Sequence, residues 1–413
     1  MAAERLRILQ LHNHHAGPGG AMEVLAHEAT ILRDAGHEVE QYTVAPAEQL
    51  GLSGIRLAAK AVWNHSVYND VRKLVSAYHP NVAHVHTPFP VMSPAVFRAA
   101  SGAGIPTVAT LHSFRYSCIA ATCLRDDRIC EDCVGSRTKW PGVAHRCYHD
   151  SVGGSAALTI GLGVHRAIGT FARQVSQYVA LTEFSRQLLI RDGFPASRIT
   201  VKPNSVPDPG VAWQPDTQRP FVAFAGRLIG VKGIATLLDA WCRLDCPGWR
   251  LRIAGDGVLR DLVEERARRD PSIEYLGWLT EDDLDALYGT AQLVVLPSQW
   301  YEGGLPLVVM RSLSMGTPVL VSDIENFAGE VLRDRAGWTF PTGDPAGLAR
   351  VLGELLADLG WMDAARERAR AAYLHRYTPA VNLRKLESLY GRLTSTRDAE
   401  PDPGQPWVGP ASA

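Results

Sequence analysis

Apolar and polar positions are ordered along the chain so that short apolar runs alternate with longer amphipathic stretches. In the first half, the apolar runs are rich in Val, Ile and Ala and are predicted to be strands at residues 7–11, 38–42, 82–86, 107–111 and 178–181. Strands that alternate with helices along a chain are typical of a parallel sheet covered by helices. We therefore expect the first half to be an α/β domain.

The second half repeats this pattern. Strands are predicted at 221–225, 250–254, 272–276, 293–296 and 318–321, with amphipathic helices between them at 234–244, 259–268 and 281–289. At 413 residues the chain is long enough for two domains of ordinary size, each with its own core. The predicted fold class is therefore α/β, with two Rossmann-like domains.

A segment dense in proline and polar residues separates the two halves and is predicted to be an exposed linker at about 204–220. We expect the first domain to occupy residues 1–205 and the second to occupy 206–378. The last residues, 395–413, contain four prolines and few apolar residues, so a disordered tail is expected there.

Composition places the chain among globular proteins. Apolar residues make up 46%, charged residues make up 21% and the net charge is -1, so we expect no nucleic acid partner. The N-terminus lacks the long apolar centre of a signal peptide. The best candidate for a membrane span, 156–171, is interrupted by His165 and Arg166 and is too short to cross a bilayer. We interpret it as a core helix and expect a cytoplasmic protein.

One basic stretch leaves peripheral membrane contact open. Residues 56–73 carry Arg56, Lys60, Arg72 and Lys73 among apolar residues, which suits an anionic membrane surface such as the inner face of the cell membrane. The alternative, a solvated amphipathic face, is the one we favour.

The loop after the strand at 221–225 carries charges that suit a phosphate group. Ligands of open parallel sheets gather at the carboxyl ends of the strands. Gly226 and Arg227 follow this strand, and Lys232 comes just before a helix that opens at Ile234. Two cations and a helix N-terminus would stabilise a departing diphosphate more than a bound donor, because its charge rises as the glycosidic bond breaks. A solvated, idle pair of cations is the alternative.

A second loop follows the strand at 293–296. Its Gly303 and Gly304 have no side chain to block a ligand, so their amides could approach phosphate or sugar hydroxyls. Glu302 is placed to accept hydrogen bonds from sugar hydroxyls, just ahead of a helix predicted to start near Pro306. A helix cap with a surface glutamate is the alternative.

Further motifs occur in the order known from one protein family. They are Gly19-Gly20-Ala-Met-Glu, Leu111-His112-Ser113, Pro203-Asn204-Ser205-Val206, Gly226-Arg227 with Lys232-Gly233, Ala254-Gly255-Asp256-Gly257, Tyr275-Leu276-Gly277-Trp278, Glu302-Gly303-Gly304 and Gly316-Thr317-Pro318. Together they resemble retaining glycosyltransferase family 4, the GT-B glycosyl transferases group 1, over nearly all of residues 6–392. Any one motif is weak evidence, whereas their joint occurrence is highly specific.

The resemblance implies two facing domains with the donor in the cleft, and a C-terminal helix at 379–394 that crosses back to the first domain. Arg227 and Lys232 would grip the donor diphosphate, Glu302 would hold the donor sugar, and His112 would lie near that sugar in the active site. The donor-binding residues that the resemblance implies are Gly19, Gly20, Gly226, Asp256, Gly303, Gly304, Leu305 and Arg311.

The resemblance also implies a reaction. A hexose-type sugar would pass from a nucleotide diphosphate sugar to a glycan, lipid-linked or small-molecule hydroxyl acceptor, in cell-surface polysaccharide or glycolipid synthesis. Anomeric configuration would be retained, with the departing phosphate taking the acceptor's proton. No cofactor is expected for catalysis, and no metal at the diphosphate, because Arg227 and Lys232 supply the positive charge there.

One position departs from the family pattern. The family places a second glutamate eight residues after the first, where it binds ribose hydroxyls, and here that place holds Met310. Counted back from Gly316, the place holds Arg311, which cannot accept hydrogen bonds as a carboxylate does. A sugar-nucleotide epimerase or hydrolase, or a catalytically dead nucleotide-sugar-binding protein, therefore stays as the alternative. A dinucleotide oxidoreductase is disfavoured because the first strand is not followed by G-x-G-x-x-G.

Five of the seven cysteines fall in a predicted insertion at about 115–150. Cys130-Glu-Asp-Cys133 has metal-ligand spacing, and Cys118 and Cys147 would complete a closed tetrahedral zinc site, with Cys123 as a spare. Stable disulfides are disfavoured in a cytoplasmic chain. Such a zinc ion would be structural, and reduced, partly buried thiols are the alternative.

Two other pairs of residues are given ordinary roles. Cys242 and Cys246 are interpreted as core residues one turn apart on a helix. His84 and His86 flank a buried strand and are interpreted as satisfied histidines without a functional role.

Overall fold

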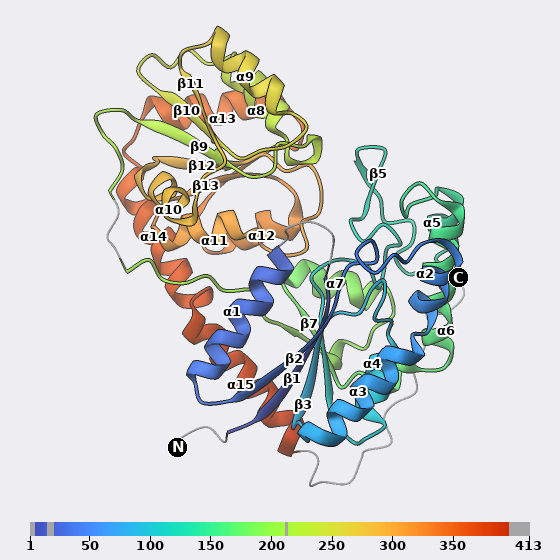
Figure 1. The fold of residues 1–413 in the computed structure, drawn as a ribbon. Coiled ribbons are helices and arrows are strands. Elements are labelled where there is room, and N and C mark those ends of the chain that lie inside the picture. The colour runs from blue at the N-terminus through green and yellow to red at the C-terminus, as the bar shows by residue number, and fades with distance from the viewer. Residues whose placement is uncertain (1–4, 15–19, 211–213, 396–413) are drawn as a thin grey trace. The chain divides into compact units, whose positions relative to one another are not determined.

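The computed structural model describes residues 5–14, 20–210 and 214–395. The chain divides into two compact units, the first made of residues 1–125, 130–203 and 382–413, and the second of residues 126–129 and 204–381 (Figure 1). Both units are α/β, as predicted, and each contains a six-stranded sheet. The expected tail at 395–413 lies, apart from Ser395, outside the described residues.

All strands of the first sheet are parallel, and their order is β2-β1-β3-β4-β7-β8. Their bounds are β1 Arg7–Asn13, β2 Glu38–Val44, β3 Val82–Thr87, β4 Thr107–Thr110, β7 Gln177–Ala180 and β8 Ile199–Val201. The five strands predicted for this half are confirmed, and β8 was not predicted. Its three residues are too few to show a period, so no pattern marks them.

Alternate residues of these strands face opposite layers of helices, which is why the inner strands are mostly apolar, whereas the edge strand β2 is mostly polar. Ile8, Val82 and Val108 pack against α1 (Gly20–Asp34) and the C-terminal helix α15 (Pro379–Ser395). Leu9 and Ala83 belong to the core of the other face. That face is covered by α3 (His65–Tyr78), α4 (Ala95–Ser101) and α6 (Val152–Ala167), while α7 (Glu183–Arg191) leads into β8 (Figure 1).

The stretch interpreted as a core helix is α6, and it is buried on one side only. Leu158 and Leu162 are in the core, but 56% of Ile160 is exposed. The basic stretch at 56–73 forms two helices, α2 (Gly54–Val62) and α3, because Asn64 caps α3 by accepting a hydrogen bond from the backbone N–H of Val67. Among the described helices, none is long and apolar enough to cross a membrane.

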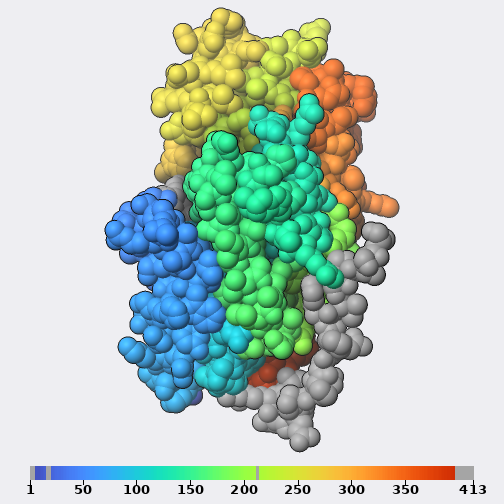
Figure 2. All heavy atoms as spheres, turned by 90° about the vertical axis from the view of Figure 1, so that its right-hand side faces the viewer, coloured from blue at the N-terminus to red at the C-terminus, as the bar shows by residue number. Residues whose placement is uncertain are grey.

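The cysteine-rich insertion follows β4 and contains little regular structure. It forms a short hairpin of β5 (Leu124–Arg125) and β6 (Arg128–Ile129) and one short helix, α5 (Trp140–Ala144). Buried Asp192, at the end of α7, fastens it: its carboxylate pairs with Lys139, accepts from the backbone N–H of Gly135, and pairs with Arg166 of α6. In Figure 2 the insertion, coloured teal to green, lies on part of the surface that faces the viewer.

The second sheet is also parallel, in the order β11-β10-β9-β12-β13-β14. Its strands are β9 Phe221–Ala225, β10 Arg250–Ala254, β11 Ile273–Gly277, β12 Leu293–Leu296, β13 Val319–Ser322 and β14 Gly337–Phe340. The first five confirm the prediction. The edge strand β14 was not predicted, since Gly337 and Thr339 interrupt its apolar run.

Helices cover both faces of this sheet. Val222 and Phe224 pack with α8 (Ile234–Trp241), α9 (Arg260–Arg269) and α13 (Pro345–Ala357), whereas Phe221 and Ala223 pack with α10 (Glu281–Thr290), α11 (Leu307–Ser314), α12 (Glu325–Arg333) and α14 (Met362–Arg376). The interpretation of Cys242 as a core residue was wrong, and that of Cys246 holds in part. Helix α8 ends at Trp241, so Cys242 is exposed, whereas Cys246 lies beyond the helix and is half-buried against the core.

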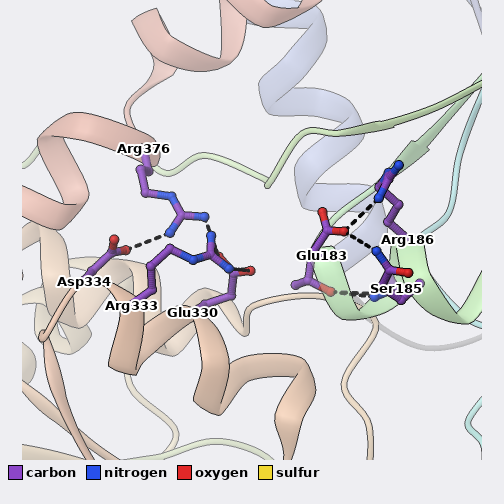
Figure 3. Close-up of polar contacts among 9 residues, drawn as sticks. Glu183, Ser185, Arg186, Glu330, Arg333, Asp334 and Arg376 are labelled. Atoms are coloured by element: carbon purple, nitrogen blue, oxygen red, sulfur yellow. Dashed lines mark hydrogen bonds and ion pairs between the residues drawn. The ribbon is translucent and has the colours of Figure 1, made fainter. Parts of the chain in front are cut away.

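Charged side chains reinforce the helices of each unit by itself. In the second unit, Arg376 of α14 pairs with Glu330 of α12 and with Asp334, and Arg333 shares Glu330 (Figure 3). In the first unit, Glu183 at the start of α7 accepts a hydrogen bond from Arg186 at 2.9 Å (Figure 3). These contacts connect side chains within and between helices of the same unit.

Candidate functional site

Loops at the carboxyl edge of the second sheet interlock through their backbones. The N–H of Gly226 donates to Ala254 O at 3.1 Å, and the N–H of Leu228 donates to Asp256 O at 2.8 Å. The N–H of Gly255 in turn donates to Gly277 O at 2.8 Å. The loops after β9, β10 and β11 therefore form one connected rim at the edge where parallel sheets bind ligands.

Two glycines make this rim possible. Gly233 has φ +71°, and a Cβ there would lie 1.8 Å from Pro297 O of the loop after β12. Gly255 has φ +134°, and a Cβ there would lie 1.9 Å from Gly226 O. No side chain fits at such distances, so glycine lets the loops after β9, β10 and β12 pack backbone against backbone.

The centre of the rim is an ion pair between Lys232 and Glu302. Lys232 Nζ lies 2.6 Å from Glu302 Oε1, and the same oxygen accepts hydrogen bonds from Ser298 Oγ at 2.7 Å and Trp300 Nε1 at 3.1 Å. Asn326 of α12 donates to the backbone carbonyl of Glu302. Among the described residues none donates to Oε2, so Glu302 is held firmly by one oxygen and keeps the other for a ligand.

The other predicted residues of this rim surround the pair. Arg227 is exposed, and within the described part of the chain it forms no ion pair or side-chain hydrogen bond. Asp256 is exposed and accepts from the N–H of Gly257 at 2.8 Å, whereas Leu305 is buried. Gly303 and Gly304 follow Glu302 just before α11, and Gly304 is buried. A diphosphate at this rim would meet Lys232 and an unshielded arginine.

The structure explains the departure at the expected second glutamate. Met310 is fully buried in the core beneath α11. The guanidinium of Arg311 lies 2.7 Å from Glu281 Oε2 and 3.9 Å from Asp285 Oδ1, both on α10. Its charge is thus already matched by carboxylates, and this pairing competes with any contact to a donor.

In the first unit, Gly20 is exposed and begins α1, while Gly19 lies outside the described residues. Helix α1 carries a buried carboxylate, Glu28, whose Oε2 lies 2.8 Å from Lys202 Nζ. Lys202 also donates to Asn382 Oδ1 of α15 at 3.2 Å. Burial alone would raise the pKa of Glu28, but Lys202, His86 and His84 together hold it far below its usual value. Glu28 is therefore ionised at all physiological pH values.

His112 belongs to the same buried network. His86 Nδ1 lies 3.0 Å from His112 Nε2, and His86 Nε2 lies 3.4 Å from Glu28 Oε1. Burial holds the pKa of both histidines well below its usual value. His84 lowers the pKa of His86 further, and His86 lowers that of His112. Both imidazoles are therefore neutral near pH 7, when each ring carries one proton.

The neutral rings have a preferred proton arrangement. Glu28 Oε1 lies 3.4 Å from both His86 Nε2 and His84 Nδ1, and His84 Nδ1 already has Tyr390 Oη at 2.7 Å, so a proton on His86 Nε2 is the one that suits Glu28 Oε1. His86 Nδ1 then accepts, and His112 Nε2 must donate to it. His112 Nδ1 is consequently unprotonated and can accept a hydrogen bond from a ligand hydroxyl.

Glu28, His84 and His86 also place three ligand atoms within 4.8 Å of one another, as a metal site would. Both nitrogens of His84 are already used, one by Tyr390 Oη and the other by Thr110 Oγ1, each at 2.7 Å. Lys202 supplies the positive charge. A metal ion would meet an ammonium and a saturated histidine, so this cluster does not suit one.

The four cysteines predicted as zinc ligands all line one cavity in the insertion. Cys118, Cys130, Cys133 and Cys147 surround it together with Asp132 and Arg125, and all four are free thiols. Cys123, predicted as the spare, is buried and is not among the residues that line this cavity.

Sequence reasoning missed part of the first unit's network. His84 and His86 were given no role, and Glu28 and Lys202 were not singled out, although they connect α1, β3 and β8 with His112. A charged residue on the apolar face of α1 is a signal that could have pointed to Glu28. In the second unit, 75% of Trp278 and 86% of Val258 are exposed on the rim loops, an unusual position for apolar side chains.

Two family models match the chain in succession. Residues 19–205 match the glycosyl transferase 4-like domain, and residues 219–358 match glycosyl transferases group 1. The first match covers the unit with His112, and the second covers the unit with the cationic rim.

Individual relatives agree with this assignment. A phosphatidyl-myo-inositol mannosyltransferase of Mycolicibacterium smegmatis is 24% identical over 395 residues, 90% of each chain. An exopolysaccharide phosphotransferase of Streptomyces coelicolor is 30% identical over 238 residues, which are 55% of this chain but only 24% of that protein. The chain thus spans about a quarter of the length of the Streptomyces relative.

Solved structures share the fold. HepE of Anabaena, crystallised in complex with UDP, superposes with a TM-score of 0.66 and 18% identity, over 94% of this chain and all of that one. Because both halves match consecutive family models and the two-domain arrangement recurs in solved relatives, the chain belongs to the glycosyl transferases group 1, with the GT-B fold.

Proposed function

We propose that the protein is a retaining glycosyltransferase that moves a hexose-type sugar from a nucleotide diphosphate sugar to a hydroxyl acceptor without a catalytic metal. The observation that carries the proposal is the cationic rim of the second unit. There Lys232, paired with Glu302, and the exposed Arg227 lie on loops at the carboxyl edge of a parallel sheet.

The rim suits a diphosphate leaving group. When the bond between the anomeric carbon and the phosphate oxygen breaks, negative charge grows on the diphosphate, so cations at this place lower the barrier. The ammonium of Lys232 has three N–H donors, so it can donate to a phosphate while it keeps its contact with Glu302. Two side-chain cations supply the charge that a divalent ion would otherwise bring.

Glu302 would hold the donor sugar. Its Oε1 is fixed by Lys232, Ser298 and Trp300, which aims Oε2 as an acceptor for sugar hydroxyls. His112 would add a second acceptor through Nδ1, a role that the family motif suggests. Exposed Trp278 offers an apolar surface for a nucleobase on the same rim as the cations.

Retention requires that the acceptor attack from the face that the leaving group vacates. The bond from the anomeric carbon to phosphate breaks, the bond to the acceptor oxygen forms on the same face, and the acceptor's proton passes to the departing phosphate. This balance needs no separate base. Glu302 receives its three donors on Oε1 and is proposed to hold the sugar through Oε2, so it is given no role as a base.

The relatives' names support a donor class and an acceptor class. HepE was also crystallised with UDP-glucose, and one relative is named for mannosyl transfer to phosphatidyl-myo-inositol and another for O-antigen chain mannosylation. We propose a nucleotide-activated hexose as donor and a glycan, lipid-linked or small-molecule hydroxyl as acceptor, in surface polysaccharide or glycolipid synthesis in the cytoplasm.

A donor screen tests the proposal. Purified protein is incubated with a panel of nucleotide sugars, with and without hydroxyl acceptors, and release of nucleoside diphosphate is measured. Acceptor-dependent release, with a product whose anomeric configuration matches the donor by NMR, is the expected result. Release without acceptor would indicate a hydrolase, conversion of the donor sugar an epimerase, and binding without turnover a dead homologue.

The same assay tests metal independence. Turnover should persist in excess chelator over short times and should need no added magnesium or manganese, because the diphosphate charge is met by Arg227 and Lys232. Immediate and complete loss that manganese alone restores would overturn this part of the proposal.

A further inference from the structure

The cysteine-rich insertion contains four cysteines that are spread along the sequence but lie close together in the fold. Cys118 and Cys147 are 29 residues apart in the chain, yet both line the same cavity as Cys130 and Cys133. None of the four is in a disulfide. Converging thiols without a covalent link are the arrangement that soft metal ions select.

Two of the four side chains, Cys118 and Cys133, are buried, and Cys130 and Cys147 are half-buried. Cys130 and Cys133 also have the C-x-x-C spacing of a metal-binding pair. A cysteine binds metal as the thiolate, and burial around one cavity keeps the four sulfurs away from other partners.

The insertion has little regular structure to hold its shape. Eight of the eleven described non-glycine residues with positive φ lie between Ala121 and Asp150, and the segment has only one short hairpin and one short helix. Lys139 fastens it to the rest of the unit, because it pairs with Asp192 and donates to Cys133 O at 2.7 Å. The remaining backbone hydrogen bonds are mostly those of separate turns, so a metal ion that links the turns would order the segment as a whole.

We infer that Cys118, Cys130, Cys133 and Cys147 bind one structural zinc ion in this cavity. Each thiol that becomes a ligand gives its proton to water. A tetrahedral site with Zn–S bonds of about 2.3 Å places the sulfurs about 3.8 Å apart. In the described structure no three cysteine sulfurs lie within 4.8 Å of one another, so zinc draws the four side chains inward.

Zinc is favoured over an iron–sulfur cluster because sugar transfer moves no electrons, and a redox-inert ion therefore suits a structural role. The site would support His112. The N–H of Cys118 donates to Phe114 O at 2.7 Å, two residues after His112, so fixing Cys118 fixes the segment that carries the histidine. The choice of zinc over an iron–sulfur cluster rests on the proposed function, whereas the cavity and its four thiols do not.

The full-length protein, purified without chelator, should contain about one zinc per chain by elemental analysis and no iron chromophore. Cys130→Ser and Cys133→Ser should each abolish bound zinc. Cys123→Ser and the exposed Cys242→Ser are matched controls and should keep it. Loss in Cys123→Ser with retention in Cys118→Ser would overturn the ligand set.

A second measurement does not depend on the folding of a variant. Cobalt substituted into the wild-type protein should show the visible bands of a tetrahedral tetrathiolate, and titration with a mercurial should release one metal as four thiols react. Limited proteolysis of the metal-free protein should cut within 115–150 while nucleoside diphosphate binding persists. A zinc-free wild-type protein that resists proteolysis there, or an iron chromophore, would overturn the inference.

Discussion

Each unit of the molecule holds an ion pair between a lysine and a glutamate, and the two pairs differ mainly in their access to solvent. In the second unit Lys232 and Glu302 lie 2.6 Å apart, with 16% and 11% of their side chains exposed. In the first unit Lys202 and Glu28 lie 2.8 Å apart, with 2% and 3% exposed. Lys232 and Glu302 lie on loops at the ends of strands, whereas Lys202 and Glu28 lie among helices and strands.

This difference decides what each pair can do. An accessible lysine can exchange part of its carboxylate contact for a phosphate, because water or ligand can satisfy either partner. A buried pair cannot exchange partners, since leaving either ion alone in the interior costs several kcal/mol. We therefore assign Lys232 and Glu302 to ligand binding, and Lys202 and Glu28 to holding the first unit together and aiming His112.

The largest expected effect is on the buried pair. Lys202→Met should lower the stability of the first unit by about 3–5 kcal/mol, because Glu28 keeps its charge without a cation. Hydrogen exchange at the amides of β3 measures this loss. The double variant Lys202→Met with Glu28→Gln should cost less than the single variant, because no unpaired carboxylate remains.

Lys232→Met is the matched comparison in the second unit. This pair is less buried, and Glu302 keeps its hydrogen bonds from Ser298 and Trp300, so the cost in stability should be smaller than for Lys202→Met. Equal losses for Lys202→Met and Lys232→Met would break the distinction between the two pairs.

The second expected effect is on turnover. Lys232→Ala and Arg227→Ala should each lower kcat by roughly 10² to 10³ while the fold survives, because each removes a cation that meets charge developing on the leaving diphosphate. Steady-state kinetics with the donor found in the screen measures the loss. Arg243→Ala is the control, since Arg243 is exposed beyond the far end of α8 and forms no ion pair in the described structure. Activity within a few-fold of wild type for both rim variants would contradict the proposed function.

The third effect concerns acid. Burial lowers the pKa of His84 to about 4, below the value of about 6.5 in an unfolded chain. Between these values the unfolded chain binds a proton that the folded unit does not, so stability falls as pH drops from about 6.5 to about 4. Below about pH 4 the lowered pKa of Glu28 also reduces stability, because Glu28 takes up a proton at a higher pH in the unfolded chain than in the folded unit.

The two units should therefore respond differently to acid. Of the fourteen histidines only His375, which is exposed, lies in the second unit. Urea unfolding followed in each unit by hydrogen exchange at several pH values should show the first unit losing about 1.4 kcal/mol per pH unit for each buried histidine that titrates. His84→Gln should flatten this slope, and the exposed His65→Gln should not. Equal slopes in both units would contradict the assignment.

The smallest effect tests how the buried network reaches the site. His86→Phe keeps a ring beside His112 but removes the acceptor for its Nε2 proton. We expect a mixture of His112 tautomers by nitrogen NMR and a fall in kcat of roughly tenfold, since about 1 kcal/mol is the net scale of one hydrogen bond. A purely structural role of His86 would leave the His112 tautomer unchanged. A single Nε2-protonated form of His112 in the variant would therefore refute the proposed effect of His86 on that tautomer.

Much of the fold was predictable because its physics is local. Parallel strands buried on both faces read as apolar runs, and ten of them were found within two residues at either end. The strands that escaped were β8, with three residues, and β14, whose pattern is broken by polar and small residues. The rim residues were predictable as well, because Arg227, Lys232 and Glu302 belong to motifs whose spacing is fixed along the chain.

The first unit's network was not predictable in this way. Glu28, His86 and Lys202 are far apart in sequence, and each alone has an ordinary explanation as a helix glutamate, a strand histidine or a surface lysine. Only their packing shows that the glutamate is fully buried and that lysine and histidine surround it. The error over Cys242 has a different cause, since the helix was predicted to run to residue 244 but ends at Trp241.

The sequence by itself determined the two α/β halves, the cationic loop, the family resemblance and the spacing of four cysteines, because periodicity, turn chemistry and motif spacing are properties of neighbouring residues. Tertiary structure alone decided which charges are buried and which are open, since burial depends on residues from distant elements. It placed four distant cysteines around one cavity and turned Arg311 toward carboxylates of α10. It also gave two similar ion pairs different degrees of exposure, and the cost of an unpaired charge depends on that exposure.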